Sequence, residues 1–518
     1  KVLINKVLTK VISNKIMKKM NLLVMSLVSA AALSFTSCSS NDDLAGDNAG
    51  QEKVDGFYMT LNVQTPKADG TRTAVVDPTE NATAVEAAIK TGTFYLVDKD
   101  NKIVFSENLK DLTWSGAVNG ENGTTTQQDG NKTFEIKVEN VEAGQKYRVY
   151  FLAGSNKPAG GMDFAATSNN FFTAATNSFA SPFADANNFA MFNQNDAQVN
   201  GNGYSVEFIK ANNNKQNPAK VTYTSADGKT TQKDAAIKVE RVVARIDAPS
   251  STSAISTDDP AGASEALKVA LKDAREKVAS FELTNYAISN LANKSYVMQT
   301  WNSSALVIPS DKEGFSYYQP KAAFGGDYDY KNGGFTTTAT DVNYVFENNS
   351  TENPTSMYFE YKVTLKDYSD ADFKDDATNA GTFYRYNNVI YTSFTQIYKD
   401  YADVANLFGE GMDADKMKNK LKSVINNETE LAAFRKNYNI EVFKGGKTYY
   451  KQVIKDNNIG YANAIQRNSI YRLKVNNIFN VGAQVPNGKP TEENAFYYLN
   501  VTVTVNPWVL NNQDVDLK

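Results

Sequence analysis

Histidine is absent from this 518-residue chain, and cysteine occurs only once, as Cys38. Without histidine, Ser-His-Asp and Cys-His catalysis, histidine-ligated zinc and histidine proton relays are all excluded. A single cysteine can form neither an intramolecular disulfide nor a thiolate metal cluster. The catalytic chemistry that remains rests mainly on carboxylates and lysine. We therefore expect no enzyme, no cofactor and no metal site.

The chain also has no large excess of positive or negative charge. The formal net charge is only -4, which gives no reason to expect nucleic acid or an acidic membrane surface as a partner. Hydrophobic residues make up 41% and charged residues 22%, an ordinary globular composition. Tyrosine and phenylalanine number 28 each, which favours strands over long helices. The length predicts two to four domains.

A leader occupies the start of the chain. The stretch MKKMNLLVMSLVSAAALSFTSC, Met17–Cys38, has two lysines, an apolar run and small residues before the cysteine. This order is typical of a secretory signal, and Cys38 at its end predicts a lipidated bacterial lipoprotein. Phe35 replaces the leucine usual at that position, and an ordinary signal peptide containing a cysteine is the alternative. We expect residues 1–38 to be leader, with the true start at Met17.

No other segment has the roughly 18 uncharged apolar residues of a membrane-spanning helix. Residues 39–72 are predicted to form a propeptide that holds a removable first strand. A polar, turn-rich tether precedes FYMTLNVQ, in which apolar residues alternate with polar ones. Arg72 lies in the Gly/Thr/Asp-rich loop behind this strand, where proteolytic nicking is favoured, and Thr73 follows it. The residues expected on the removable apolar face are Phe57, Met59, Leu61 and Val63.

The rest of the chain predicts a mainly β protein with two antiparallel β-sandwich domains, residues 73–240 and 241–518. The stretch Ile237–Pro249 is expected to be one strand near the boundary, with Arg241 and Arg245 on the same face. A small helical insertion is expected in the second domain. Its apolar residues Met417, Leu421 and Val424 have helical spacing, and Asp413 or Asp415 can cap its start.

The last strand resembles the first. Alternating apolar residues occur within residues 495–518, and Pro507 is expected to interrupt the strand before Trp508. A strand of this kind can fill the groove that the first strand leaves in another copy. Its apolar side chains would contribute about 8–15 kcal/mol before ordering costs. Repeated head to tail, such a contact builds a filament. The donor residues predicted are Tyr497, Leu499, Val501, Val503, Val505 and Trp508.

Other readings of the same residues stay open. Both terminal strands can simply pair within their own domains. A surface lipoprotein that binds glycans or peptides would use exposed aromatics such as Tyr328, Tyr330 and Trp301. The acid-rich stretch Asp367–Gly381 could suggest a carboxylate hydrolase or a calcium loop. It lacks the glycine turn and distal glutamate of an EF-hand, and a solvated loop accounts for it.

Several stretches together resemble one family. KVERVVARID, GQKYRVYFLAGSN, GKTYYKQVIKD followed by IQRNSIYRLKVNNI, and LNVTVTVNPWVLNNQDVDL occur in this order. They are similar to segments of the FimA/Mfa-type major fimbrillins of Porphyromonas and related Bacteroidetes, the stalk subunits of type V pili. No single stretch is specific, but their order and the lipoprotein leader extend the resemblance over most of the chain.

The resemblance implies two transthyretin-like β-sandwiches exported through the periplasm as an outer-membrane lipoprotein. It also implies cleavage after Arg72 by an Arg-specific surface protease, with Lys67 as the weaker alternative. Polymerisation would then follow by donor-strand exchange. The implied partners are copies of the chain itself, fimbrial anchor and tip accessory subunits, and unidentified host or bacterial receptors. Adhesion, coaggregation and biofilm formation would follow. The helical insertion is more like the short-fimbria subunits.

Overall fold

The structure is a computed structural model. It describes residues 56–64, 80–81, 86, 89–110, 131–154, 157–158, 160–164, 170–174, 183–185, 188–194, 203–225, 227–302, 305–310, 314–318, 342–456, 465–486 and 499–509. Residues Val54–Lys518 form one compact unit, separate from Lys1–Lys53. The leader with Cys38, the cleavage residues Arg72 and Thr73, and Tyr497 lie outside the described residues.

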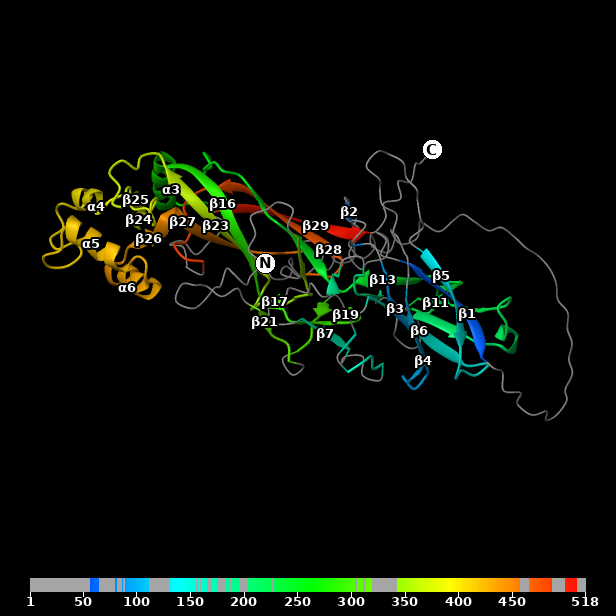
Figure 1. The fold of residues 1–518 in the computed structure, drawn as a ribbon. Helices are drawn as coiled ribbons and strands as arrows, with labels where there is room; N and C mark the ends of the chain where they lie inside the picture. Colours follow the sequence, from blue (N-terminus) through cyan, green and yellow to red (C-terminus); the bar gives the residue numbers. More distant parts are fainter. Residues whose placement is uncertain are drawn as a thin grey trace, which may run out of the picture. The chain divides into compact units, whose positions relative to one another are not determined.

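The described chain is mainly β, as predicted (Figure 1). An eleven-stranded sheet has the order β10-β1-β13-β8-β6-β9-β11-β12, with β3 paired to β4 and β6, and β5 paired to β1. Its strands are β1 (Phe57–Gln64), β3 (Gly92–Val97), β4 (Ile103–Leu109), β5 (Asn131–Val138), β6 (Lys146–Ala153), β8 (Met191–Asn193), β9 (Gly203–Glu207), β10 (Ala219–Lys220), β11 (Thr222–Thr224), β12 (Thr231–Lys233) and β13 (Ile237–Arg241).

A six-stranded sheet has the order β2-β29-β28-β14-β22, with β15 paired to β28. Its strands are β2 (Glu80–Asn81), β14 (Ala244–Asp247), β15 (Ser250–Ser251), β22 (Val342–Val345), β28 (Ser469–Ile478) and β29 (Leu499–Val509). A three-stranded sheet contains β16 (Val278–Ser289), β23 (Ser356–Leu365) and β27 (Lys447–Val453). Two-stranded pairs join β17 (Leu291–Ala292) to β21 (Tyr317–Tyr318), β18 (Lys294–Tyr296) to β7 (Phe171–Thr173), and β19 (Thr300–Asn302) to β20 (Ala305–Val307).

Most strand pairs are antiparallel, as expected, but β1 with β10 and β13, β14 and β15 with β28, and β2 with β29 are parallel. The partners in these pairs lie far apart in the sequence, so the connection is long enough for a parallel crossover. The sequence pattern of each strand is the same in both arrangements. Its alternation therefore identifies the strand and not its neighbour.

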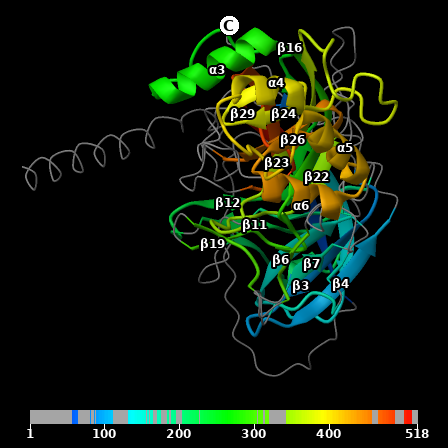
Figure 2. The ribbon, with the colours of Figure 1, turned by 90° about the vertical axis from the view of Figure 1, so that its left-hand side faces the viewer.

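The predicted helical insertion is confirmed (Figures 1 and 2). Helix α5 (Ala414–Val424) begins at Asp413, whose side chain accepts from the Lys416 amide, and it buries Met417 and Leu421. Helices α4 (Phe394–Asp400) and α6 (Glu428–Tyr438) pack with it on a sheet of β24 (Phe383–Tyr386), β25 (Val389–Tyr391) and β26 (Glu441–Phe443) around a separate apolar core. Short 3₁₀ turns occupy Lys210–Asn212 and Lys444–Gly446.

The second domain was expected to hold one helical insertion, and α3 (Glu265–Lys277) was missed. Ser264 caps this helix, and Leu267, Ala270, Leu271 and Ala274 are buried at helical spacing. The signal was therefore present in the sequence as a cap followed by an apolar stripe. Among the described residues, no helix is both long and apolar enough to span a bilayer.

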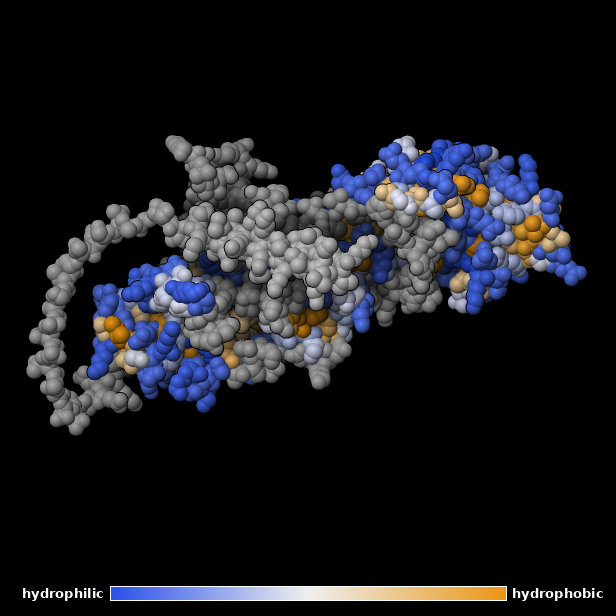
Figure 3. Space-filling model, turned by 180° about the vertical axis from the view of Figure 1, so that it is seen from behind, coloured by the Kyte–Doolittle hydropathy of each residue, from blue (hydrophilic) through white to orange (hydrophobic). Residues whose placement is uncertain are grey.

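The stretch predicted as one strand over Ile237–Pro249 is two strands in different sheets. β13 ends at Arg241 in the eleven-stranded sheet, and β14 starts at Ala244 in the six-stranded sheet. Buried Val242 and Val243 between them belong to the first apolar core, whereas Ala244 begins the second. The change of sheet lies within a few residues of the predicted domain boundary, but the two-domain division stays a prediction. Figure 3 shows polar residues over most of the visible described surface.

Candidate functional site

Strand β1, the predicted removable strand, lies inside its sheet. Every residue from Phe57 to Gln64 pairs antiparallel with β5. On the other side, Met59 and Thr60 pair with β10, while Val63 and Gln64 pair with β13. Since both edges of β1 are occupied, loss of this strand would leave unpaired backbone groups on three neighbours.

The apolar face of β1 is buried. Met59, Leu61 and Val63 have no exposed surface, Phe57 is 5% exposed, and the Phe57 ring lies 5.4 Å from that of Phe208. At about 1.5–3 kcal/mol per side chain, these four contribute about 6–12 kcal/mol. Any strand that replaced β1 would have to supply a comparable apolar surface.

The opposite face of β1 is polar. Asn62 Nδ2 donates to Asp234 Oδ1 at 3.2 Å in an exposed position. Thr60 Oγ1 is buried without a hydrogen-bond partner among the described residues. The ladder and the buried apolar face both attach β1 to its sheet.

Strand β29 carries the predicted donor residues, and in this structure it pairs with its own chain. It runs antiparallel to β28, with Leu499 opposite Ile478, Val503 opposite Leu473 and Pro507 opposite Ser469. Its other edge pairs with β2 only at Trp508 and Val509, in the part of the chain that the structure describes. Over most of its length β29 is thus paired on one side.

The expectation that Pro507 interrupts this strand is wrong, because β29 continues to Val509. Pro507 pairs with Ser469, the first residue of β28, and the next residue pairs with β2. The missing amide therefore lies where one neighbour ends and another begins, which keeps the loss of a ladder donor small. Leu499 is buried at 5% exposure.

Glu86, downstream of β1, forms hydrogen bonds with residues of both the eleven-stranded and the six-stranded sheet. Its carboxylate Oε1 accepts from Arg245 Nη1 at 3.0 Å and from the Tyr344 hydroxyl at 2.9 Å. Its main-chain carbonyl accepts from Arg241 Nε at 3.3 Å and Nη2 at 3.2 Å. Arg241 lies in β13 and Arg245 in β14, so they do not share the face of one strand as predicted, although both donate to Glu86.

Burial sets the ionisation of this cluster. It lowers the pKa of Arg241 to about 9, although the charge of Glu86 opposes the shift. Burial also raises the pKa of Tyr344, and the Glu86 carboxylate raises it further. Burial alone would lower the pKa of Arg245, but the hydrogen bond to Asp247 and the Glu86 charge raise it. Both arginines therefore remain charged at neutral pH. Glu86 was missed because 155 residues separate it from Arg241.

The last part of the chain is similar to a known family. Residues 441–514 match the C-terminal family model of the fimbrillins, described as major fimbrial subunit protein type IV. This confirms the predicted resemblance to fimbrillins. The match spans β26, β27, β28 and β29, including the predicted donor strand. No curated protein matches the chain.

Two solved structures share 14% identity with the chain at a TM-score of 0.42. One is a fimbrilin, FimA, of Porphyromonas gingivalis W83, with 89% of this chain and 100% of that chain covered. The other is a proposed cell adhesion protein of Parabacteroides distasonis, with 89% and 99% covered. The tip fimbrial protein Mfa3 of P. gingivalis, truncated at its C-terminus, has 10% identity and a TM-score of 0.29, with 87% and 99% covered. TM-scores this low carry no argument about function.

Proposed function

We propose that this protein is a structural subunit of a bacterial surface fimbria. It is exported as a lipoprotein through Cys38, cut after Arg72, and polymerised head to tail when the C-terminal strand of one copy fills the place of β1 in the next. The main-chain ladder would provide affinity, and the alternating side chains would set the register. The assembled fimbria would support adhesion and biofilm formation.

The observation that carries the proposal is the position of β1. An eight-residue strand at the start of the compact unit fills the inside of a sheet with four buried apolar side chains. The covalent link between β1 and the rest of the unit is the segment that follows β1, and this segment includes Arg72. A single cut there would separate the strand, while Glu86 keeps the downstream chain attached to β13 and β14.

The fimbrillin match over residues 441–514 supports β29 as the donor, because it includes this whole strand. β29 has 11 residues against eight in β1, so its length suffices for the vacant place. It would first have to leave β28, and a comparable ladder and apolar face in the neighbour would offset that loss. The irreversible cut then prevents β1 from competing again.

The test uses the chain from Thr36 onward with Cys38→Ser, treated with an Arg-specific protease. We expect one cut after Arg72 by intact mass, followed by a ladder on an unboiled SDS gel. The matched control Arg72→Gln should stay uncut and monomeric, and deletion of residues 497–518 should permit the cut but abolish the ladder. A ladder that forms without the cut, or that survives the deletion, would contradict strand exchange.

Lipidation and location are tested separately in cells. Metabolic labelling with a radioactive fatty acid should label the wild-type protein and not Cys38→Ser. The lipidated precursor should fractionate with the outer membrane, and the cut form with sheared fimbriae. If cut protein is recovered only as monomer on the cell surface, a monomeric surface lipoprotein that binds glycans or peptides replaces the fimbrial subunit. Anchor and tip subunits should co-purify with sheared fimbriae.

A further inference from the structure

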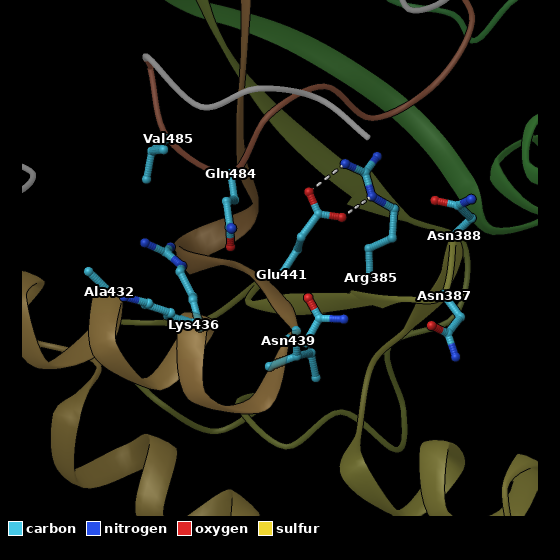
Figure 4. Close-up of a pocket in the computed structure, with 11 residues that line it drawn as sticks. Arg385, Asn387, Asn388, Ala432, Lys436, Asn439, Glu441, Gln484 and Val485 are labelled. Carbon is cyan, nitrogen blue, oxygen red and sulfur yellow. Dashed lines mark hydrogen bonds and ion pairs between the residues drawn. The ribbon is translucent and has the colours of Figure 1, made fainter. Parts of the chain in front are cut away.

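An open cavity of about 540 Å³ lies in the helical insertion (Figure 4). Its walls are the last turns of α6, the turn between β24 and β25, the start of β26, and residues Gln484 and Val485. These segments come from three separate parts of the sequence. The cavity is distant in the chain from β1 and is not needed for strand exchange.

A bidentate ion pair between Arg385 and Glu441 forms one wall of the cavity. Arg385 Nε donates to Glu441 Oε2 at 2.5 Å and its Nη2 donates to Oε1 at 2.7 Å, as the dashed lines in Figure 4 mark. Arg385 also donates to the carbonyls of Val481 and Gly482, and its guanidinium lies over the Phe443 ring. The charges of Arg385 and Glu441 cancel each other. This pair builds the wall, and the charge of Glu441 also acts on Arg435, whose pKa it raises against the effect of burial.

Two positive charges in the cavity have no such counterpart. Neither Arg435 nor Lys436 has a carboxylate within 4.0 Å among the described residues. Arg435 is 9% exposed, its Nη2 donates to the Val442 carbonyl at 2.5 Å, and its Nε is buried without a partner in the described structure. Burial lowers the pKa of Arg435 to about 10, so it remains charged at neutral pH. Lys436 is exposed beside it.

Amide side chains make up most of the remaining polar lining. Asn387 and Asn388 occupy left-handed positions in the turn, with φ of 48° and 66°, and Asn439 ends α6 with φ of 48°. Gln484 Oε1 accepts from the Val442 amide at 2.7 Å, which fixes its orientation. Each amide offers both donors and acceptors, the combination that a hydroxyl group needs. The cavity thus combines amide side chains with two cations that have no carboxylate within 4.0 Å among the described residues.

We propose that this cavity binds an acidic saccharide, a sugar that carries a carboxylate. The carboxylate pairs with Arg435 and Lys436, and the hydroxyls bond to the amides of the turn and of Gln484. None of the eleven lining residues is aromatic, so a neutral sugar would find no ring to stack on. Charge must therefore supply the affinity and limit the ligand to acidic sugars.

The test titrates the chain from Thr36 onward with tri-galacturonic acid, with its methyl ester and with N-acetylglutamate, by ligand-observed NMR. Only the free acid should bind saturably below about 10 mM, and higher salt should weaken it. Lys436→Glu should weaken binding at least about fivefold, whereas the matched reversal Lys399→Glu, exposed on α4 outside the cavity, should not.

A second variant tests the contacts to the sugar hydroxyls apart from those to the carboxylate. Asn388→Gly, which removes the amide at an exposed turn position and tolerates its left-handed φ, should weaken the trisaccharide about threefold and leave the fold unchanged. The proposal is overturned if the acid does not bind, if the ester binds equally well, or if Lys436→Glu has no effect. Equal affinity for N-acetylglutamate would overturn the saccharide assignment. None of these results bears on strand exchange, which the protease experiment tests.

Discussion

Leu61→Ala in β1 is expected to destabilise the eleven-stranded sheet strongly in the uncut protein. Leu61 has no exposed surface and lies among the buried side chains of the first apolar core. Its truncation removes apolar contacts and leaves a cavity, because the neighbouring strands β5 and β13 can collapse only in part. The cost expected is about 2–5 kcal/mol.

Hydrogen exchange of peptides from β5 and β13 measures this loss directly. At 1.4 kcal/mol per factor of ten, protection of these amides should fall by about 30-fold or more. Asn62→Ala, on the polar face of the same strand, should cost less than about 1 kcal/mol. Thr60→Val should have the opposite sign and stabilise β1 by about 1 kcal/mol, because it removes a buried hydroxyl without a described partner.

Cleavage after Arg72 provides the decisive comparison. Once β1 has been replaced, residue 61 no longer belongs to the folded unit, so wild-type, Leu61→Ala and Thr60→Val proteins should show equal exchange in β5 and β13. Leu61→Ala should also polymerise faster after the cut, because its strand leaves more readily. Differences among the variants that persist after the cut would refute the removal of β1.

Three other predictions concern the scaffold. Glu86→Gln should lower the free energy of unfolding by about 2 kcal/mol in a urea titration, because Arg245 and the Tyr344 hydroxyl lose a charged acceptor while Asp247 still pairs with Arg245. Burial alone would raise the pKa of Glu360, but hydrogen bonds and the charge of Lys447 lower it below 4.5. The stabilisation by ionised Glu360 is therefore present above pH 4.5 and is lost as the pH falls. In Glu360→Gln, the free energy of unfolding should change less with pH in this range. Asp413→Ala should destabilise α5 by about 1 kcal/mol, and Asp415→Ala by less, in unfolding titrations followed by the helical circular dichroism signal.

Controls for these predictions come from the same chain. Glu265→Gln removes one partner of an exposed ion pair with Lys268 and should cost less than about 1 kcal/mol. A Glu86→Gln protein no less stable than this control would contradict the buried anchor. Equal acid sensitivity of Glu360→Gln and wild type would contradict the lowered pKa. An Asp415→Ala effect as large as that of Asp413→Ala would contradict the assigned cap.

Local patterns were enough to predict several elements. The alternation in FYMTLNVQ predicted β1 and its buried face, and the spacing of Met417 and Leu421 predicted α5. Either Asp413 or Asp415 could cap that helix on sequence grounds, and the structure assigns Asp413. These features depend on residues only a few positions apart, so the sequence contains the information. Helix α3 was missed although the same kind of signal was present.

Other features depend on which distant segments meet. The sequence could not reveal that β1 has parallel neighbours, because strand alternation is the same for every partner. It gave no sign that Glu86 meets Arg241 and Arg245 or that Arg435 and Gln484 line one cavity, because such contacts depend on the packing of separate elements. The effect of Pro507 was predicted from local propensity alone, but Pro507 lies opposite the first residue of β28, where the loss of an amide is tolerated. The sequence by itself thus determined the fold class, single elements such as β1 and α5, and the fimbrillin resemblance. The tertiary structure decided the strand neighbours, the buried ion pairs and the cavity.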